Sequence, residues 1–133
     1  KQMKKKTIIS LCLIAVVCFA CFAPALALQD NRITPCAIVT FSSGMPKVAG
    51  TTNKYNPYAI ASVGLPEQLS VGFTLYKVVN GNEIYITSDS DGGYGNYFEA
   101  EAVVTLSKGT YKLYAYYRGE TKSDGSVKVY NID

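Results

Sequence analysis

Few side chains in this sequence of 133 residues are suited to catalysis. Histidine is absent, which excludes Ser-His and Cys-His nucleophile pairs and most transition-metal sites. Glu99 and Glu101 form a carboxylate pair, because residues two apart on a strand lie about 7 Å apart on one face, and such a pair can flank a glycosidic bond. Nothing in the sequence predicts a cleft around them. A carboxylate-based hydrolase is therefore a remote alternative, and we expect no catalytic residues.

The stretch Asp-Ser-Asp-Gly-Gly at residues 89–93 has the composition of a calcium-binding loop. An EF-hand loop that starts at residue 89 needs Gly at its sixth place and Glu at its twelfth, but Tyr94 and Ala100 stand there. Aspartate and glycine are also ordinary loop residues. We therefore expect no metal and no cofactor. The weak candidates for a calcium site are Asp89, Asp91 and Asn96.

The eleven tyrosines are the remaining chemical feature. A tyrosine combines a rigid apolar ring with a hydroxyl, which suits contacts with sugar rings and with protein partners. If the strands alternate as predicted below, one outer sheet face gathers several of them with two lysines. This candidate ligand or partner face consists of Tyr76, Tyr85, Tyr114, Tyr116, Tyr130, Lys112 and Lys128. The alternative is that tyrosine serves here only as a good strand former, with Tyr76 and Tyr85 as a stabilising cross-strand pair.

Residues 1–27 have the features of a secretory signal peptide. Two residues precede Met3, three lysines follow it, residues 7–22 are almost entirely apolar, and Ala25-Leu26-Ala27 provides a cleavage site. A retained membrane anchor is the alternative, but the apolar run is shorter than the roughly 20 residues that span a bilayer. The sequence therefore predicts a secreted, extracellular protein that meets the membrane only through its leader before cleavage.

Removal of the leader changes both charge and cysteine content. Four of the 13 basic residues and none of the 10 acidic ones lie in it, so the remaining chain has nine against ten, a net charge of −1. A near-neutral domain lacks the positive surface that binds nucleic acid. Cys36 is the only cysteine after the leader, so no intramolecular disulfide can form. Cys36 either links two chains as a homodimer or is a small buried apolar residue.

Residues 36–133 show the alternation of polar and apolar residues that is typical of β-strands. We expect residues 28–35 to be a flexible lead-in, and residues 88–95 to be a loop. Residues 53–68 should also be a loop, since Leu65-Pro66 is unsuited to a central strand. The predicted strands are residues 36–42, 47–52, 69–79, 82–87, 98–106, 111–117 and 127–130, with Val127 and Val129 facing the core in the last.

Asn80-Gly81 lies between two alternating runs and predicts a two-residue type I′ hairpin. This turn places Val79 opposite Asn82, Tyr76 opposite Tyr85, and Leu75 opposite Ile86. Ile84 and Ile86 then share the apolar face with Leu75, which supports the register.

Seven strands and no helix after the leader predict an all-β fold, an antiparallel two-sheet sandwich of immunoglobulin-like type. Tyr111 lies two residues before Leu113, as a corner tyrosine of immunoglobulin domains lies two before a cysteine; the alternative is an ordinary core tyrosine. With no Trp and no possible disulfide, the pattern resembles fibronectin type III domains more than antibody domains.

The hairpin Tyr-Lys-Val-Val-Asn-Gly at residues 76–81 and the run Ser-Lys-Gly-Thr-Tyr-Lys-Leu-Tyr-Ala at residues 107–115 resemble segments of a known group. This group comprises small secreted single-domain β-sandwich proteins of Gram-positive bacteria, and the resemblance covers roughly residues 36–118. It implies a fold and secretion, but no catalytic residue, because the function of the group is uncharacterised. We expect a non-catalytic binding or adhesion module for a cell-surface or extracellular protein or glycan. The alternative is a self-assembling structural protein.

Overall fold

The computed structural model describes residues 39–133. The predicted leader, the predicted lead-in and Cys36 lie outside the described residues. Those described form seven strands and no helix: β1 (Val39–Gly44), β2 (Lys54–Tyr55), β3 (Tyr58–Val79), β4 (Asn82–Glu101), β5 (Val104–Thr105), β6 (Gly109–Gly119) and β7 (Ser123–Ile132). All pairings between them are antiparallel. The described part of the chain has no helix with the length and hydropathy to cross a membrane. The predicted all-β class is confirmed.

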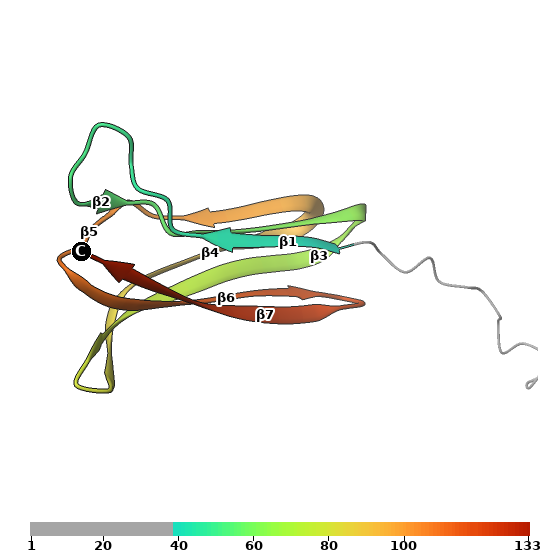
Figure 1. Ribbon diagram of the computed structural model, residues 1–133. Helices are drawn as coiled ribbons and strands as arrows, with labels where there is room; N and C mark the ends of the chain where they lie inside the picture. The colour runs from blue at the N-terminus through green and yellow to red at the C-terminus, as the bar shows by residue number, and fades with distance from the viewer. Residues whose placement is uncertain (1–38) are drawn as a thin grey trace, which may run out of the picture. The chain divides into compact units, whose positions relative to one another are not determined.

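The long strand β3 organises the main sheet. It pairs with β4 along both of its halves, while its other edge pairs first with β1 and then with β6, which in turn pairs with β7. Figure 1 shows β3 and β4 turning back together, so that β1 and the neighbouring parts of β3 and β4 lie over the part that contains β6 and β7. The main sheet is thus one curled sheet, an open half-barrel, and the expected two-sheet sandwich is not confirmed. Strands β2 and β5 form a separate small sheet.

The bend in β3 explains why the predicted loop at residues 53–68 is wrong. The pairing with β4 passes from Ser62 opposite Tyr97 directly to Glu67 opposite Gly95. Residues 63–66 therefore have no partner in β4. Pro66 has no N–H to donate, and its place in this unpaired corner means that the missing donor disrupts no ladder.

Two further segments differ from the prediction. Residues 88–95 form part of β4, paired with β3, because their glycines allow close contact between the strands. A Cβ atom at Gly92 would lie 2.8 Å from the carbonyl oxygen of Leu69. Residues 47–52 form no strand, and only an isolated bridge joins Lys47 to Tyr55. In this segment the hydroxyl of Thr51 donates to the carbonyl of Val48, 2.7 Å away, which stabilises a turn.

The hairpin between β3 and β4 confirms the type I′ prediction, with positive φ at Asn80 (52°) and Gly81 (81°). Val79 opposes Asn82 and Tyr76 opposes Tyr85, as expected. The predicted pair of Leu75 with Ile86 is wrong, because an irregularity next to Tyr76 places Leu75 opposite Thr87. Such a bulge adds one unpaired residue to one strand.

The core lies on the concave side of the curled sheet. Alanines and other small side chains on the part of the sheet that contains β1 meet larger side chains on the part that contains β6 and β7. This allows the two parts of the sheet to pack closely. The buried apolar residues are Met45, Ala59, Ala61, Val63, Leu69, Val71, Phe73, Leu75, Ala100, Leu106, Tyr111, Leu113, Ala115 and Tyr117. Tyr111 donates a hydrogen bond to the carbonyl of Ser107, 2.7 Å away and four residues upstream. A corner tyrosine makes a bond of this kind.

Candidate functional site

Four of the five tyrosines predicted for the outer face are brought together on the convex side of the sheet. They are Tyr76 on β3, Tyr85 on β4, and Tyr114 and Tyr116 on β6, and we call this set the tyrosine face. The ring centroid of Tyr76 lies 6.3 Å from that of Tyr85 and 5.6 Å from that of Tyr114, both edge to face. This is a favoured arrangement for aromatic pairs. Three adjacent strands thus bring three tyrosine rings into contact, and Tyr116 lies two residues along β6 from Tyr114 on the same side of the strand.

At the end of the tyrosine face nearest the hairpin between β3 and β4, the carboxylate of Glu83 contacts two side chains of β6. Glu83 accepts a hydrogen bond from the Tyr114 hydroxyl at 2.6 Å and pairs with the Lys112 ammonium at 2.9 Å. The Tyr114 hydroxyl, followed by Lys112, lowers the pKa of Glu83, and the bond to Glu83 raises the pKa of both partners. Glu83 was not among the predicted site residues. The hairpin register could have identified it, because Glu83 and Tyr85 share one face of β4.

Replacing Glu83 with Gln is expected to lower the pKa of Tyr114, because its phenol loses the carboxylate that keeps it protonated. Ultraviolet or ¹³C NMR titration of the tyrosines measures this. The raised pKa of Tyr114 favours the fold below the ordinary tyrosine pKa of 10.0, and that contribution disappears as pH rises through the folded value. The lowered pKa of Glu83 favours the fold above 4.5, and that contribution disappears as pH falls through the folded value.

Tyr97 provides the matched control for this titration. Its hydroxyl donates to Glu99 at 2.8 Å, and this bond raises its pKa. It lies on the other half of β4, opposite Ser62. We expect Glu83→Gln to leave the titration of Tyr97 unchanged and Glu99→Gln to lower its pKa. An unchanged pKa of Tyr114 in the Glu83→Gln variant would contradict the hydrogen bond between Tyr114 and Glu83.

The ring of Tyr116 lies across Gly72, its neighbour on β3. A Cβ atom at Gly72 would be 2.6 Å from the Tyr116 hydroxyl oxygen, so a larger residue would displace the ring. Next to it is a hollow of about 290 Å³, whose lining residues are Phe73, Thr74, Ser88, Asp89, Ser90 and Tyr116. This hollow was not predicted from the sequence, because Ser88 and Ser90 lie in a segment predicted to be a loop.

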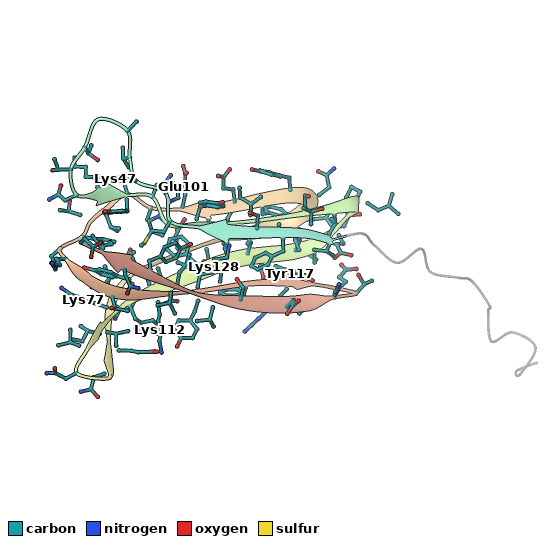
Figure 2. The ribbon with its side chains drawn as sticks, in the orientation of Figure 1. Lys47, Lys77, Glu101, Lys112, Tyr117 and Lys128 are labelled. Atoms are coloured by element: carbon teal, nitrogen blue, oxygen red, sulfur yellow. The ribbon has the colours of Figure 1, made fainter. Side chains whose placement is uncertain are left out.

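Tyr130 and Lys128 do not join the tyrosine face, so their predicted outward orientation is wrong. The pairing of β7 with β6 places Tyr130 opposite the buried Tyr111 and Lys128 opposite the buried Leu113. Tyr130 packs against the core, and burial raises its pKa. The Lys128 ammonium donates to the carbonyl of Ser43 on β1. Figure 2 shows Lys128 between the two parts of the curled sheet and Lys112 below them.

The same register reverses the expected orientation of two valines. Val127 and Val129 were expected to face the core, but they are 55% and 58% exposed. They lie opposite Tyr114 and Lys112, and they therefore extend the tyrosine face onto β7. The physical reason is that the inner side of β7 meets the edge of β1, where polar contacts to Ser43 replace a backbone ladder.

Glu99 and Glu101 lie on the outer side of β4, opposite Ile60 and Tyr58, as their alternation predicted. Glu99 accepts from Tyr97, and Glu101 accepts a hydrogen bond from the Asn56 side chain at 3.3 Å. Neither carboxylate lines the hollow beside Tyr116. This arrangement gives no support to the hydrolase alternative.

The candidate calcium ligands have other partners. Asp89 accepts a hydrogen bond from the backbone N–H of Glu101 at 3.0 Å, and Asp91 accepts one from that of Glu99 at 3.4 Å. These bonds join the two halves of β4 across the open edge of the half-barrel. Residues 39–133 contain no group of three or more acidic, cysteine or histidine side chains placed to hold a metal ion. The two aspartates therefore have a structural role in this edge.

A second hollow, of about 230 Å³, lies where β3, β4 and the end of β6 meet. Its lining residues are Gln68, Leu69, Ser70, Gly93, Arg118, Gly119 and Glu120. No aromatic side chain lines it. Arg118 also lies 5.5 Å from the ring centroid of Tyr116, so this residue separates the second hollow from the one beside Tyr116.

No family model matches this chain, and no curated protein matches it either.

Proposed function

We propose that this chain is a secreted, non-catalytic binding or adhesion module, which uses the tyrosine face for an extracellular glycan or protein. The single observation that carries the proposal is the clustering of Tyr76, Tyr85, Tyr114 and Tyr116 on one convex surface. Tyrosine offers a large contact area at low conformational cost, together with a hydroxyl, and it is enriched at binding hot spots. The predicted signal peptide at residues 1–27 supports an extracellular setting.

The proposed relation to immunoglobulin-like sandwiches has one support in the structure. Tyr111 is 1% exposed, and its hydroxyl bonds to the backbone four residues upstream, as in a tyrosine corner. In such domains the sheet provides a rigid scaffold. The resemblance to secreted Gram-positive sandwich proteins belongs to the same proposal.

The double variant Tyr114→Ala/Tyr116→Ala is expected to abolish binding to cell-wall or host-cell surfaces, because it removes the centre of the tyrosine face. The thermal midpoint should change by only a few degrees, since about 1 kcal/mol corresponds to about 4–8 °C in a domain of this size. Pull-down on purified cell walls and on host-cell glycans and proteins measures binding. Tyr97→Ala is the matched control, because Tyr97 is 53% exposed but lies outside this face. Equal binding by the natural chain, the double variant and Tyr97→Ala would refute the proposal.

Self-assembly through the same face is a second candidate function, favoured by the exposed Val127 and Val129. Face-to-face contact between two copies would cover them together with the tyrosines. Sedimentation at high concentration, with and without reductant, tests it and also reports on pairing through Cys36. A monomer under both conditions rules it out.

A further inference from the structure

We infer that the hollow beside Tyr116 is a subsite for one uncharged pyranose ring of a glycan. The inference rests on the proposed binding function and names the ligand class and the residues within it. The hollow measures about 290 Å³, near the lower end of small-ligand sites at about 300 Å³. Its size therefore suits a single sugar ring better than a protein loop.

One wall of the hollow is an aromatic ring that packs on a glycine. Tyr116 is 37% exposed, and its ring lies over Gly72, where the absence of a Cβ leaves the space it needs. On the other side of β6, Tyr116 lies opposite Gly125. The two glycines leave the ring without neighbouring side chains along its row of the sheet. A flat apolar ring next to a polar wall matches the face of a pyranose, which carries C–H groups on its faces and hydroxyls at its edges.

The opposite wall consists of hydroxyl groups. Thr74 and Ser88 face each other across β3 and β4, and Ser90 faces Gly72 in the next row. A serine or threonine hydroxyl both donates and accepts hydrogen bonds, as sugar hydroxyls do. The Ser88 hydroxyl lies 3.0 Å from that of Tyr85, so this wall continues directly into the tyrosine face.

Asp89 is the one charged residue that lines the hollow, and its side chain lies on the inner side of the strands, away from Tyr116, which favours an uncharged sugar. Phe73 and Asp89 lie on the inner side of the strands, since Phe73 is buried and opposes Asp89. The Asp89 carboxylate accepts a hydrogen bond from the backbone N–H of Glu101 on the other half of β4. Lys112 and Glu83 neutralise each other nearby. Arg118, which lies at the margin over the Tyr116 ring, is the one cation whose role the experiment must separate.

The test is an NMR titration of the ¹⁵N-labelled full chain with three probes: a β-1,4-glucose hexamer, an N-acetylglucosamine hexamer and a polygalacturonate oligomer. An uncharged hexamer should shift the amide signals of Gly72, Thr74, Ser88, Ser90 and Tyr116. Gly72→Ala should weaken its binding about tenfold or more by displacing the ring, an effect typical of central contacts. The variant Thr74→Val/Ser88→Ala should weaken it similarly, whereas Tyr116→Phe should change it less than about threefold because the ring remains.

Ser42→Ala and Tyr97→Ala are the controls, and both should bind as the natural chain does. Thr74→Val alone is nearly isosteric and keeps the test valid if Gly72→Ala unfolds. If an uncharged hexamer binds the natural chain and the variants at Gly72, Thr74 and Ser88 with equal affinity, the subsite is refuted. The proposed glycan-binding function would survive that result. Binding of polygalacturonate alone, lost in Arg118→Ala, also refutes it. If no saccharide binds, the subsite is wrong, and protein pull-down on the tyrosine face decides the proposed function separately.

Discussion

Replacing Leu113 with alanine is expected to lower the free energy of unfolding by about 3 to 4 kcal/mol, because large-to-small changes leave a cavity as well as losing buried surface. Leu113 lies at the centre of β6, opposite Leu75, and both side chains are 0% exposed. Domains of this size have a total stability of about 5 to 15 kcal/mol. The change should therefore remove a large share of the stability and can unfold the chain at 37 °C.

Leu65→Ala is the matched control, since it makes the same substitution at a side chain that is 62% exposed. Its effect should stay within about 0.5 kcal/mol. Urea denaturation measures both variants, and a shift in midpoint at constant slope reports a change in stability alone. Equal losses in the two variants would mean that the concave side of the sheet is not the principal core.

The strongly alternating segments allowed correct predictions from sequence. Leu69, Val71, Phe73 and Leu75 face the core, as do Tyr111, Leu113, Ala115 and Tyr117, because a slip by one residue would expose all of them at once. The Asn80-Gly81 turn fixed the pairing of Tyr76 with Tyr85 in the same way. These two constraints were sufficient to place four of the five predicted tyrosines and Lys112 on one face.

Local patterns could not predict contacts at the edges of the half-barrel. Lys128 faces inward because it reaches Ser43, 85 residues earlier in the chain. The rule that apolar residues point to the core places Val127 and Val129 inside, whereas both are exposed in the structure. An inward charge on an edge strand also discourages pairing with another chain. The segment at residues 88–95 was missed for a related reason, since its pairing depends on β3 and not on its own propensity.

The variant Asp89→Ala/Asp91→Ala is expected to open the other edge of the half-barrel. The backbone N–H groups of Glu99 and Glu101 point to these two carboxylates, and unpaired groups on an edge strand are available to water and to other chains. Hydrogen bonds to charged groups contribute about 1.5 to 3 kcal/mol when shielded, and exposure reduces this to about 1 kcal/mol each. We expect a combined loss of about 2 kcal/mol, together with faster hydrogen exchange at these two amides.

Asp124→Ala separates this edge contact from a purely local effect. Asp124 accepts a hydrogen bond from the N–H of the following glycine, Gly125, just as Asp91 does from Gly92, but it has no partner across the edge in the described structure. Its replacement should leave exchange at Glu99 and Glu101 unchanged. If the double variant also leaves their exchange unchanged, the two halves of β4 are held together by the core alone. If exchange rises and the variant associates into larger species, the aspartates both close the half-barrel and keep its edge from pairing with other chains.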